Sequence, residues 1–135
     1  MIPGEELASL GNIKGSPSVF GFKFDMHTLD SDEEDGASLV AASFDKETGK
    51  QIIKKEKLAR AITTINGVPF SVSQEEKDQK ITELQKARKL IYKWQSPVVN
   101  RVYEELLKLE AQRDEAVAAL EKNAPTPTTP TGSGR

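Results

Sequence analysis

The sequence predicts an α+β fold, in which a small N-terminal β-hairpin region is followed by two long amphipathic helices and a Pro/Thr-rich tail. Three observations support this class. Phenylalanines alternate with other residues near position 20, as on one face of a strand. The pair Asn66-Gly67 separates two extended runs, as in a tight hairpin turn. Beyond residue 73, apolar residues recur three and four positions apart, as on a helix. We therefore divide the chain into a β-rich region (1–72), a helical region (73–123) and a tail (124–135).

The first part of the β-rich region is predicted from three runs. In residues 18–25, SVFGFKFD, three Phe side chains share one face of a half-buried strand and anchor the β core. An acidic loop over residues 25–36 follows. Residues 37–45 form a second apolar run, and KETG then offers a turn. We expect residues 50–55 to be a third strand, in a hairpin around Gly49.

A second hairpin is expected around Asn66-Gly67, with strands over residues 60–65 and 68–72. This pair readily adopts the positive φ angles of a type I′ turn. Pro69 confines the second strand to an edge or an end of a sheet, because proline cannot donate a ladder hydrogen bond. The start of the run over residues 57–65 is also compatible with a helix.

Two helices are predicted, over residues 73–95 and 97–122. The first begins at a capping box of Ser73 and Glu76, and the second begins at Ser96-Pro97, a cap followed by proline in the first turn. The apolar stripe of the first helix consists of Ile81, Leu84, Ala87, Leu90, Ile91 and Trp94, and that of the second of Val99, Val102, Tyr103, Leu106, Leu109, Val117 and Leu120. The chain either folds back between the helices as a hairpin or only kinks there.

The tail APTPTTPTGSGR is almost entirely Pro, Thr, Gly and Ser. Such a composition favours extended, polyproline-like conformations. We expect it to be disordered on its own and to be ordered only by another chain.

Composition predicts a thin core and a need for partners. Of the 135 residues, 36% are hydrophobic, below the roughly 45–50% typical of globular domains, a range that also counts Gly. A net charge of −2 argues against a general nucleic-acid binder, which is normally basic. We expect no signal peptide, because residues 1–12 lack a basic region followed by an apolar run. We also expect no membrane span, because no run of about 18 apolar residues occurs.

No catalytic constellation is recognisable, so we expect no enzyme activity, no catalytic residues, no cofactor and no metal. Cysteine is absent, and His27 is the only imidazole. We interpret His27 as a surface residue, with metal binding beside Asp25 and Asp30 as the alternative. The acidic run that starts at Asp30 lacks the Gly and Glu that a calcium-binding EF-hand loop needs at its sixth and twelfth positions. We interpret that run as a solvated loop.

One positive stretch has two interpretations. It comprises Lys50, Lys54, Lys55, Lys57 and Arg60. The favoured interpretation is an exposed strand edge protected by lysines, and the alternative is contact with nucleic-acid phosphates.

An aromatic cluster flanks the break between the two helices, and it includes Trp94, the only Trp of the chain. The favoured interpretation of Trp94 is a core anchor. The alternative is that part of this surface is reserved for a neighbouring subunit, because aromatic residues dominate interface hot spots. The interface candidates are Tyr92, Trp94, Val98, Val99, Val102, Tyr103, Leu106 and Leu109.

A resemblance covers residues 57–120. The hairpin LARAITTINGVPF is followed by a charged helix and then by KLIYKWQSPVVNRVYEELLKLEAQRDEAV. The matching residues are Ile65, Asn66, Gly67, Val68, Trp94, Val98, Val99 and Tyr103. This order resembles small tail-assembly and baseplate-hub proteins of bacteriophages. The resemblance implies a structural or assembly role in the virion, without enzyme activity, and it transfers no active site.

Together these features predict a structural or assembly protein of a phage tail or baseplate. We expect it to pack against other tail proteins or further copies of itself, to be assembled in the host cytoplasm, and to use neither membrane nor nucleic acid. One alternative is a tail-assembly chaperone or helical adaptor that leaves the finished virion. The other is a nucleic-acid-binding accessory protein that uses the basic stretch.

Overall fold

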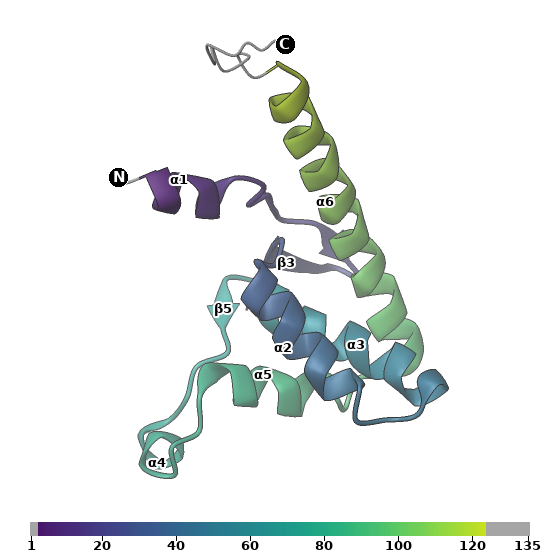
Figure 1. Ribbon diagram of the computed structural model, residues 1–135. Helices are drawn as coiled ribbons and strands as arrows, with labels where there is room; N and C mark the ends of the chain where they lie inside the picture. The colour runs from purple at the N-terminus through teal and green to yellow at the C-terminus, as the bar shows by residue number, and fades with distance from the viewer. Residues whose placement is uncertain (1–2, 124–135) are drawn as a thin grey trace.

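An antiparallel sheet and a group of helices pack together in the computed structural model of the protein, which describes residues 3–123 (Figure 1). The predicted α+β class is confirmed. In chain order the elements are α1 (Pro3–Ser9), β1 (Lys14–Gly15), β2 (Ser18–Val19), β3 (Phe22–His27), α2 (Ser31–Ala41), α3 (Lys46–Ala61), β4 (Ile62–Ile65), β5 (Val68–Pro69), α4 (Gln74–Asp78), α5 (Glu83–Ile91) and α6 (Ser96–Asn123). The predicted tail lies outside the described residues.

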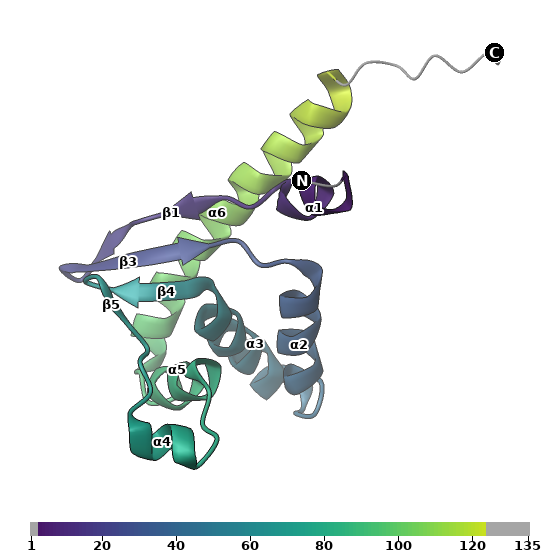
Figure 2. The ribbon, with the colours of Figure 1, turned by 90° about the vertical axis from the view of Figure 1, so that its left-hand side faces the viewer.

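Strand β3 is the centre of the sheet (Figure 2). On one edge it pairs with β1 and then β2, and on the other it pairs with β4, which pairs with β5. All pairs are antiparallel. Alternation along β3 turns Phe24 and Met26 into the core, while Asp25 accepts hydrogen bonds from Ser16 and Thr64 on the other face.

Two tight turns close the hairpins of this sheet. Asn66 and Gly67 have φ angles of 53° and 78°, and Ile65 pairs with Val68 across them. Positive φ at both central residues is the requirement of a type I′ turn. The predicted Asn-Gly hairpin is therefore confirmed, although its strands are shorter than predicted. The second turn joins β2 to β3 through Phe20-Gly21, within a run predicted to be one continuous strand.

The predicted acidic loop over residues 25–36 is wrong, because half of it is helical. Asp30 caps α2: its side chain accepts from the Glu33 amide at 2.8 Å, and Glu33 accepts from the Asp30 amide. Carboxylates in the first turn also favour a helix, since they face the positive end of its dipole. The acidic run that looked like a solvated loop is therefore a helix start.

The predicted hairpin around Gly49 is also wrong, because residues 46–61 form helix α3. Asp45 accepts from the Thr48 amide at 3.0 Å and caps the helix. Gly49 does not turn the chain. It lets α3 approach α2, since a Cβ at Gly49 would lie 3.0 Å from the carbonyl oxygen of Ala41.

The predicted helix over residues 73–95 is two helices, α4 and α5. The capping box of Ser73 and Glu76 is confirmed. The helix then stops, because Lys80 adopts a φ of 61°, which the helix cannot continue through. A second capping box, made by Thr82 and Gln85, restarts it as α5.

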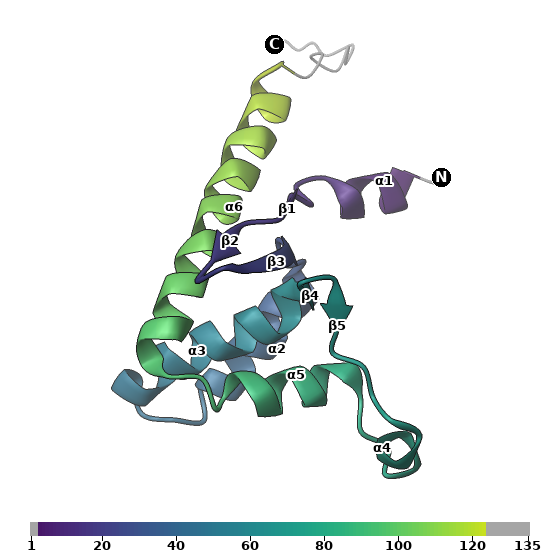
Figure 3. The ribbon, with the colours of Figure 1, turned by 180° about the vertical axis from the view of Figure 1, so that it is seen from behind.

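The long helix predicted over residues 97–122 is confirmed as α6, and the junction before it is an elbow rather than a hairpin. In Figure 3, α5 and α6 leave their junction in different directions. Trp94 fills the elbow and packs edge-to-face on Phe24, with ring centroids 6.2 Å apart.

The core lies between the sheet and helices α3, α5 and α6. Its fully buried members include Leu58, Ile91, Val99, Val102 and Leu106. Strand β1 comes close to α6, since a Cβ at Gly15 would lie 2.8 Å from Leu109. Helix α1 buries no residue, and the C-terminal half of α6 extends beyond the other helices (Figure 1).

Candidate protein-binding surface

An apolar groove of about 340 Å³ opens beside the β2–β3 turn, and we call it the aromatic groove. It is lined by Phe20, Phe22, Phe24, Ile65, Trp94 and Val98. Phe20 and Phe22 are 61% and 49% exposed, whereas Phe24 at its floor is 4% exposed. Large rings left open to water in one contiguous patch are typical of protein-interaction sites.

The β2–β3 turn presents Phe20 at an energetic cost. Phe20 has a φ of 55°, in the left-handed region that bulky residues avoid, and Gly21 follows at 80°. Backbone strain of this kind costs on the order of 1–3 kcal/mol and often marks a functional position. Asn or Gly would suit the turn better, and neither would give the groove a ring.

The far wall of the aromatic groove comes from the α5–α6 elbow. Trp94 is held by its contact with Phe24, and Val98 lies in the first turn of α6. Because Phe24 contacts Trp94 from the sheet, the two walls of the groove have fixed relative positions. The binding surface is therefore largely preformed.

The eight predicted interface candidates separate into three groups. Trp94 and Val98 line the aromatic groove. Val99, Val102, Leu106 and Leu109 are buried in the core of the chain itself, where no partner reaches them. Tyr92 and Tyr103 are half-buried, and cationic side chains lie over the face of each ring. The sequence analysis did not predict that Phe20 and Phe22 are exposed. The signal that could have shown it is Gly21, which favours a turn between these two residues.

The predicted lysine-protected strand edge is wrong, because the basic stretch lies on helix α3, where contacts within the chain occupy most of its charges. Lys57 pairs with Glu110 at 2.7 Å, and Lys54 donates to Asn100 at 3.1 Å. Both amines also lie within 6 Å of the Tyr103 ring centre, which is cation–π distance. These contacts leave little free charge for phosphates.

Tyr92 belongs to a buried charge cluster around Glu56. The Glu56 side chain is fully buried and accepts from Arg60 Nη1 at 2.7 Å, from Arg88 Nε at 2.9 Å and from the Tyr92 hydroxyl. Burial raises the pKa of Glu56, but hydrogen bonds from Tyr92, Arg60 and Arg88 outweigh it and leave the pKa below its ordinary value. The cluster joins α3 to α5 and to the elbow.

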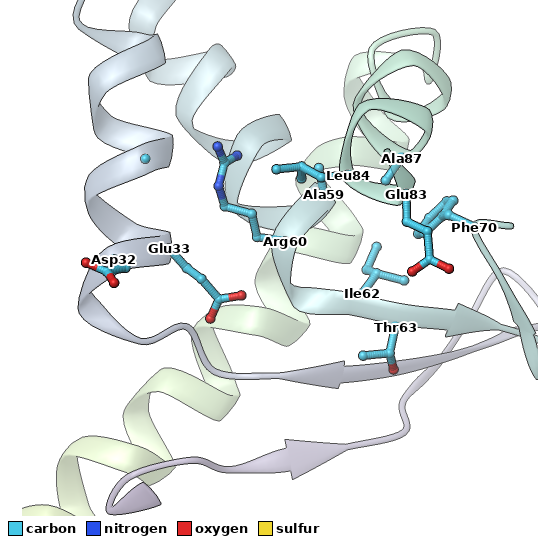
Figure 4. Close-up of a pocket in the computed structure, with 11 residues that line it drawn as sticks. Asp32, Glu33, Ala59, Arg60, Ile62, Thr63, Phe70, Glu83, Leu84 and Ala87 are labelled. Atoms are coloured by element: carbon cyan, nitrogen blue, oxygen red, sulfur yellow. The ribbon is translucent and has the colours of Figure 1, made fainter. Parts of the chain in front are cut away.

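A larger cavity of about 550 Å³ lies between α2, α3 and α5 (Figure 4). Its polar side chains include Glu33, Arg60 and Glu83. In Figure 4 the guanidinium of Arg60 points away from the carboxylates of Glu33 and Glu83, and Arg60 is already bound by Glu56. The cavity therefore offers no convergent set of groups for chemistry.

His27 ends strand β3, with Nδ1 2.8 Å from the carbonyl oxygen of Thr28. Asp25 is bound by Ser16 and Thr64, and Asp30 caps α2. Within residues 3–123, no group of acidic or His side chains gathers to hold a metal ion.

Comparisons with protein families, with characterised proteins and with solved structures found no match to this chain. None of the helices between residues 3 and 123 is long and apolar enough to cross a membrane.

Proposed function

We propose that this protein is a structural or assembly subunit of a bacteriophage tail or baseplate, which acts by packing against other proteins rather than by catalysis. The observation that carries the packing role is the aromatic groove, where strained Phe20 and its neighbour Phe22 stay exposed beside Trp94 and Val98. The tail or baseplate assignment is supported by the resemblance of residues 57–120 to phage tail-assembly and baseplate-hub proteins.

The arrangement of contacts also supports a packing role. Several ionisable groups are engaged in structural contacts: Glu56 pairs with two arginines, Lys57 pairs with Glu110, and Asp25 accepts a hydrogen bond from Ser16. Large apolar side chains also stay exposed: those of the aromatic groove, together with Leu7 in α1, Leu10 just after it and Leu120 near the end of α6. Surfaces of this kind bind by shape and burial.

The second candidate is a tail-assembly chaperone or helical adaptor that leaves the finished particle. It would use the same aromatic groove, so a chaperone and a structural subunit can be distinguished only by the copy number of the chain in finished particles. A nucleic-acid accessory role is less well supported, because contacts within the chain occupy the basic stretch on α3.

Quantitative mass spectrometry of purified particles and tail intermediates tests the proposal. A structural subunit is expected at a fixed copy number in finished particles, and a chaperone only in intermediates. Absence of the chain from both would overturn the proposal.

Two substitutions in the phage test the surface itself. Phe20→Asn removes the ring but suits the positive φ of the turn, so it should fold and still lower the yield of tails by at least about tenfold. Phe44→Asn is the matched control: Phe44 is 45% exposed and lies between α2 and α3, outside the groove. It is expected to leave tail yield unchanged.

A further inference from the structure

We propose that the aromatic groove binds the segment 124–130 of a second copy of this chain, so that copies join head to tail. This inference rests on the proposed function, because it names a partner for the same surface. The groove is at the start of α6, and the segment follows the end of α6.

The chemistry of the segment matches the groove. Its sequence, APTPTTP, contains Pro127-Thr128-Thr129-Pro130, a Pro-x-x-Pro motif. Prolines three residues apart lie on the same side of a polyproline helix, which has three residues per turn. Pro-x-x-Pro peptides dock in grooves lined by aromatic rings, and they lose little conformational entropy on binding.

Charge is matched as well. The six residues that line the groove are all uncharged, and the segment APTPTTP has no charged side chain. A basic or acidic peptide would have to bury its charges in the groove without partners, which is costly. An uncharged, proline-rich occupant avoids that cost.

Geometry excludes the chain's own segment. Val98 lies in the groove and Asn123 ends α6, so 25 residues of helix separate them, or about 38 Å at ~1.5 Å per residue. The seven residues from Asn123 to Pro130 span at most about 25 Å even when fully extended. The proline motif therefore cannot reach the groove of its own chain.

The contact is heterologous, because it joins different surfaces of two identical chains. Such contacts form rings when the rotation between copies closes, and filaments when it does not. The last residue of α6 lies away from the sheet and from helices α3 and α5 (Figure 1), so a second copy can approach this end of the helix.

The test uses two full-length variants with complementary defects. Phe20→Asn disables the groove and keeps the segment. The triple variant Pro125→Ala, Pro127→Ala, Pro130→Ala disables the segment and keeps the groove. Phe44→Asn is the control for loss of an exposed ring. Sedimentation velocity is measured from micromolar to millimolar concentrations, for each protein alone and for the mixture of the two defective variants.

We expect the native chain and Phe44→Asn to self-associate as concentration rises. Each defective variant alone should associate at least about tenfold more weakly. The mixture should form one-to-one complexes, because it contains one intact groove and one intact segment. Unchanged self-association of either defective variant, or a mixture that stays monomeric, would overturn the inference.

Trp94 provides a second readout, since it is the only Trp and lines the groove. A synthetic peptide of residues 122–135 should shift its fluorescence emission on titration, and the same peptide with Pro127 and Pro130 replaced by Ala should not. If no shift occurs while Phe20→Asn still lowers tail yield, another protein occupies the groove. That result would contradict binding of the segment 124–130 but would remain consistent with the proposed function.

Discussion

At the scale of single residues, Glu56 has the most demanding environment. Its carboxylate is fully buried on α3 and holds Arg60 of the same helix, Arg88 of α5 and Tyr92 of the elbow. A buried charge is tolerated only when it is paired and hydrogen-bonded. The position of the elbow, and with it Trp94, therefore depends on this carboxylate.

Glu56→Gln is expected to lower the free energy of unfolding by about 2–4 kcal/mol, because it leaves two arginines without a counter-charge. Urea denaturation at neutral pH measures the loss. Glu47→Gln is the control, because its ion pair with Lys50 is exposed and long at 3.4 Å, and it should change stability by no more than about 0.5 kcal/mol.

The pH dependence of that loss follows from the lowered pKa of Glu56. A carboxyl group with a depressed folded-state pKa contributes stability that is complete above its ordinary value of 4.5 and is lost as the pH falls through its folded-state pKa. The difference between the native protein and Glu56→Gln should therefore shrink below pH 4.5. A difference that is constant down to strong acid would contradict this assignment.

At the scale of elements, Glu76 connects α4 to α5. Its carboxylate accepts from Lys86 Nζ at 2.8 Å and from the Ser73 amide at 3.0 Å. The Lys86 bond is the main reason why the pKa of Glu76 falls to about 2. The short helix α4 buries no residue, so this contact and its cap are what hold it near α5.

We expect an NMR titration of the Glu76 carboxyl carbon to have its midpoint near pH 2. In Lys86→Met the midpoint should rise toward 4.5, while the capping box keeps it below that value. Because the folded-state pKa is depressed, the contact stabilises the protein above pH 4.5 and is lost as the pH falls toward 2. A midpoint that does not move in Lys86→Met would show that the ion pair does not form in solution.

Sequence patterns predicted the turns and helix starts that depend on one or two neighbouring residues. Asn66-Gly67 and the Ser73 cap each have a strong conformational preference, and each is where it was expected. Pro97 lies in the first turn of α6 as expected, but Ser96 does not cap it: the helix begins at Ser96, and the carbonyl of Gln95 accepts from the amides of Val98 and Val99. Helix α2 was missed because its acidic first turn looked like a loop, although Asp30 and Glu33 form a capping box. Helix α3 was not predicted because Gly49 in KETG is typical of a turn, whereas in the fold this glycine allows α3 to approach α2.

The aromatic groove was harder to predict, because it is assembled from segments distant in sequence. Trp94 and Val98 were among the interface candidates, but their partner Phe20 was expected inside a strand. Gly21 was the one local signal of a turn, and the pairing of Val19 with Phe22 shows that Phe20 lies in that turn and is exposed. The thinning of the apolar stripe of α6 after Leu109 agrees with the point where the helix leaves the core, since Leu109 is buried and Leu120 is exposed.

At the scale of the whole molecule, the first half of α6 packs in the core and its second half is largely exposed to solvent. Leu106 is fully buried, whereas Leu120 on the same stripe is 52% exposed. Helix α1 similarly buries no side chain. The molecule is therefore a compact centre with two helical extensions, α1 and the end of α6, that leave apolar side chains such as Leu7 and Leu120 exposed.

Amide hydrogen exchange should reveal this division in the isolated chain. We expect strong protection over residues 99–109 and exchange close to that of a fraying helix over residues 114–123, because the buried side chains of α6 all lie in the first segment. Uniform protection along α6 in dilute, monomeric protein would contradict the division.

The length of α6 would also determine the distance between neighbouring copies. In a row of copies in which each segment 124–130 occupies the next groove, the repeat is set by the helix between Val98 and Asn123. Adding one residue to its free half would lengthen the spacing by ~1.5 Å and rotate the following copy by about 100°. Adding seven residues, about two turns, would nearly restore the orientation while widening the row.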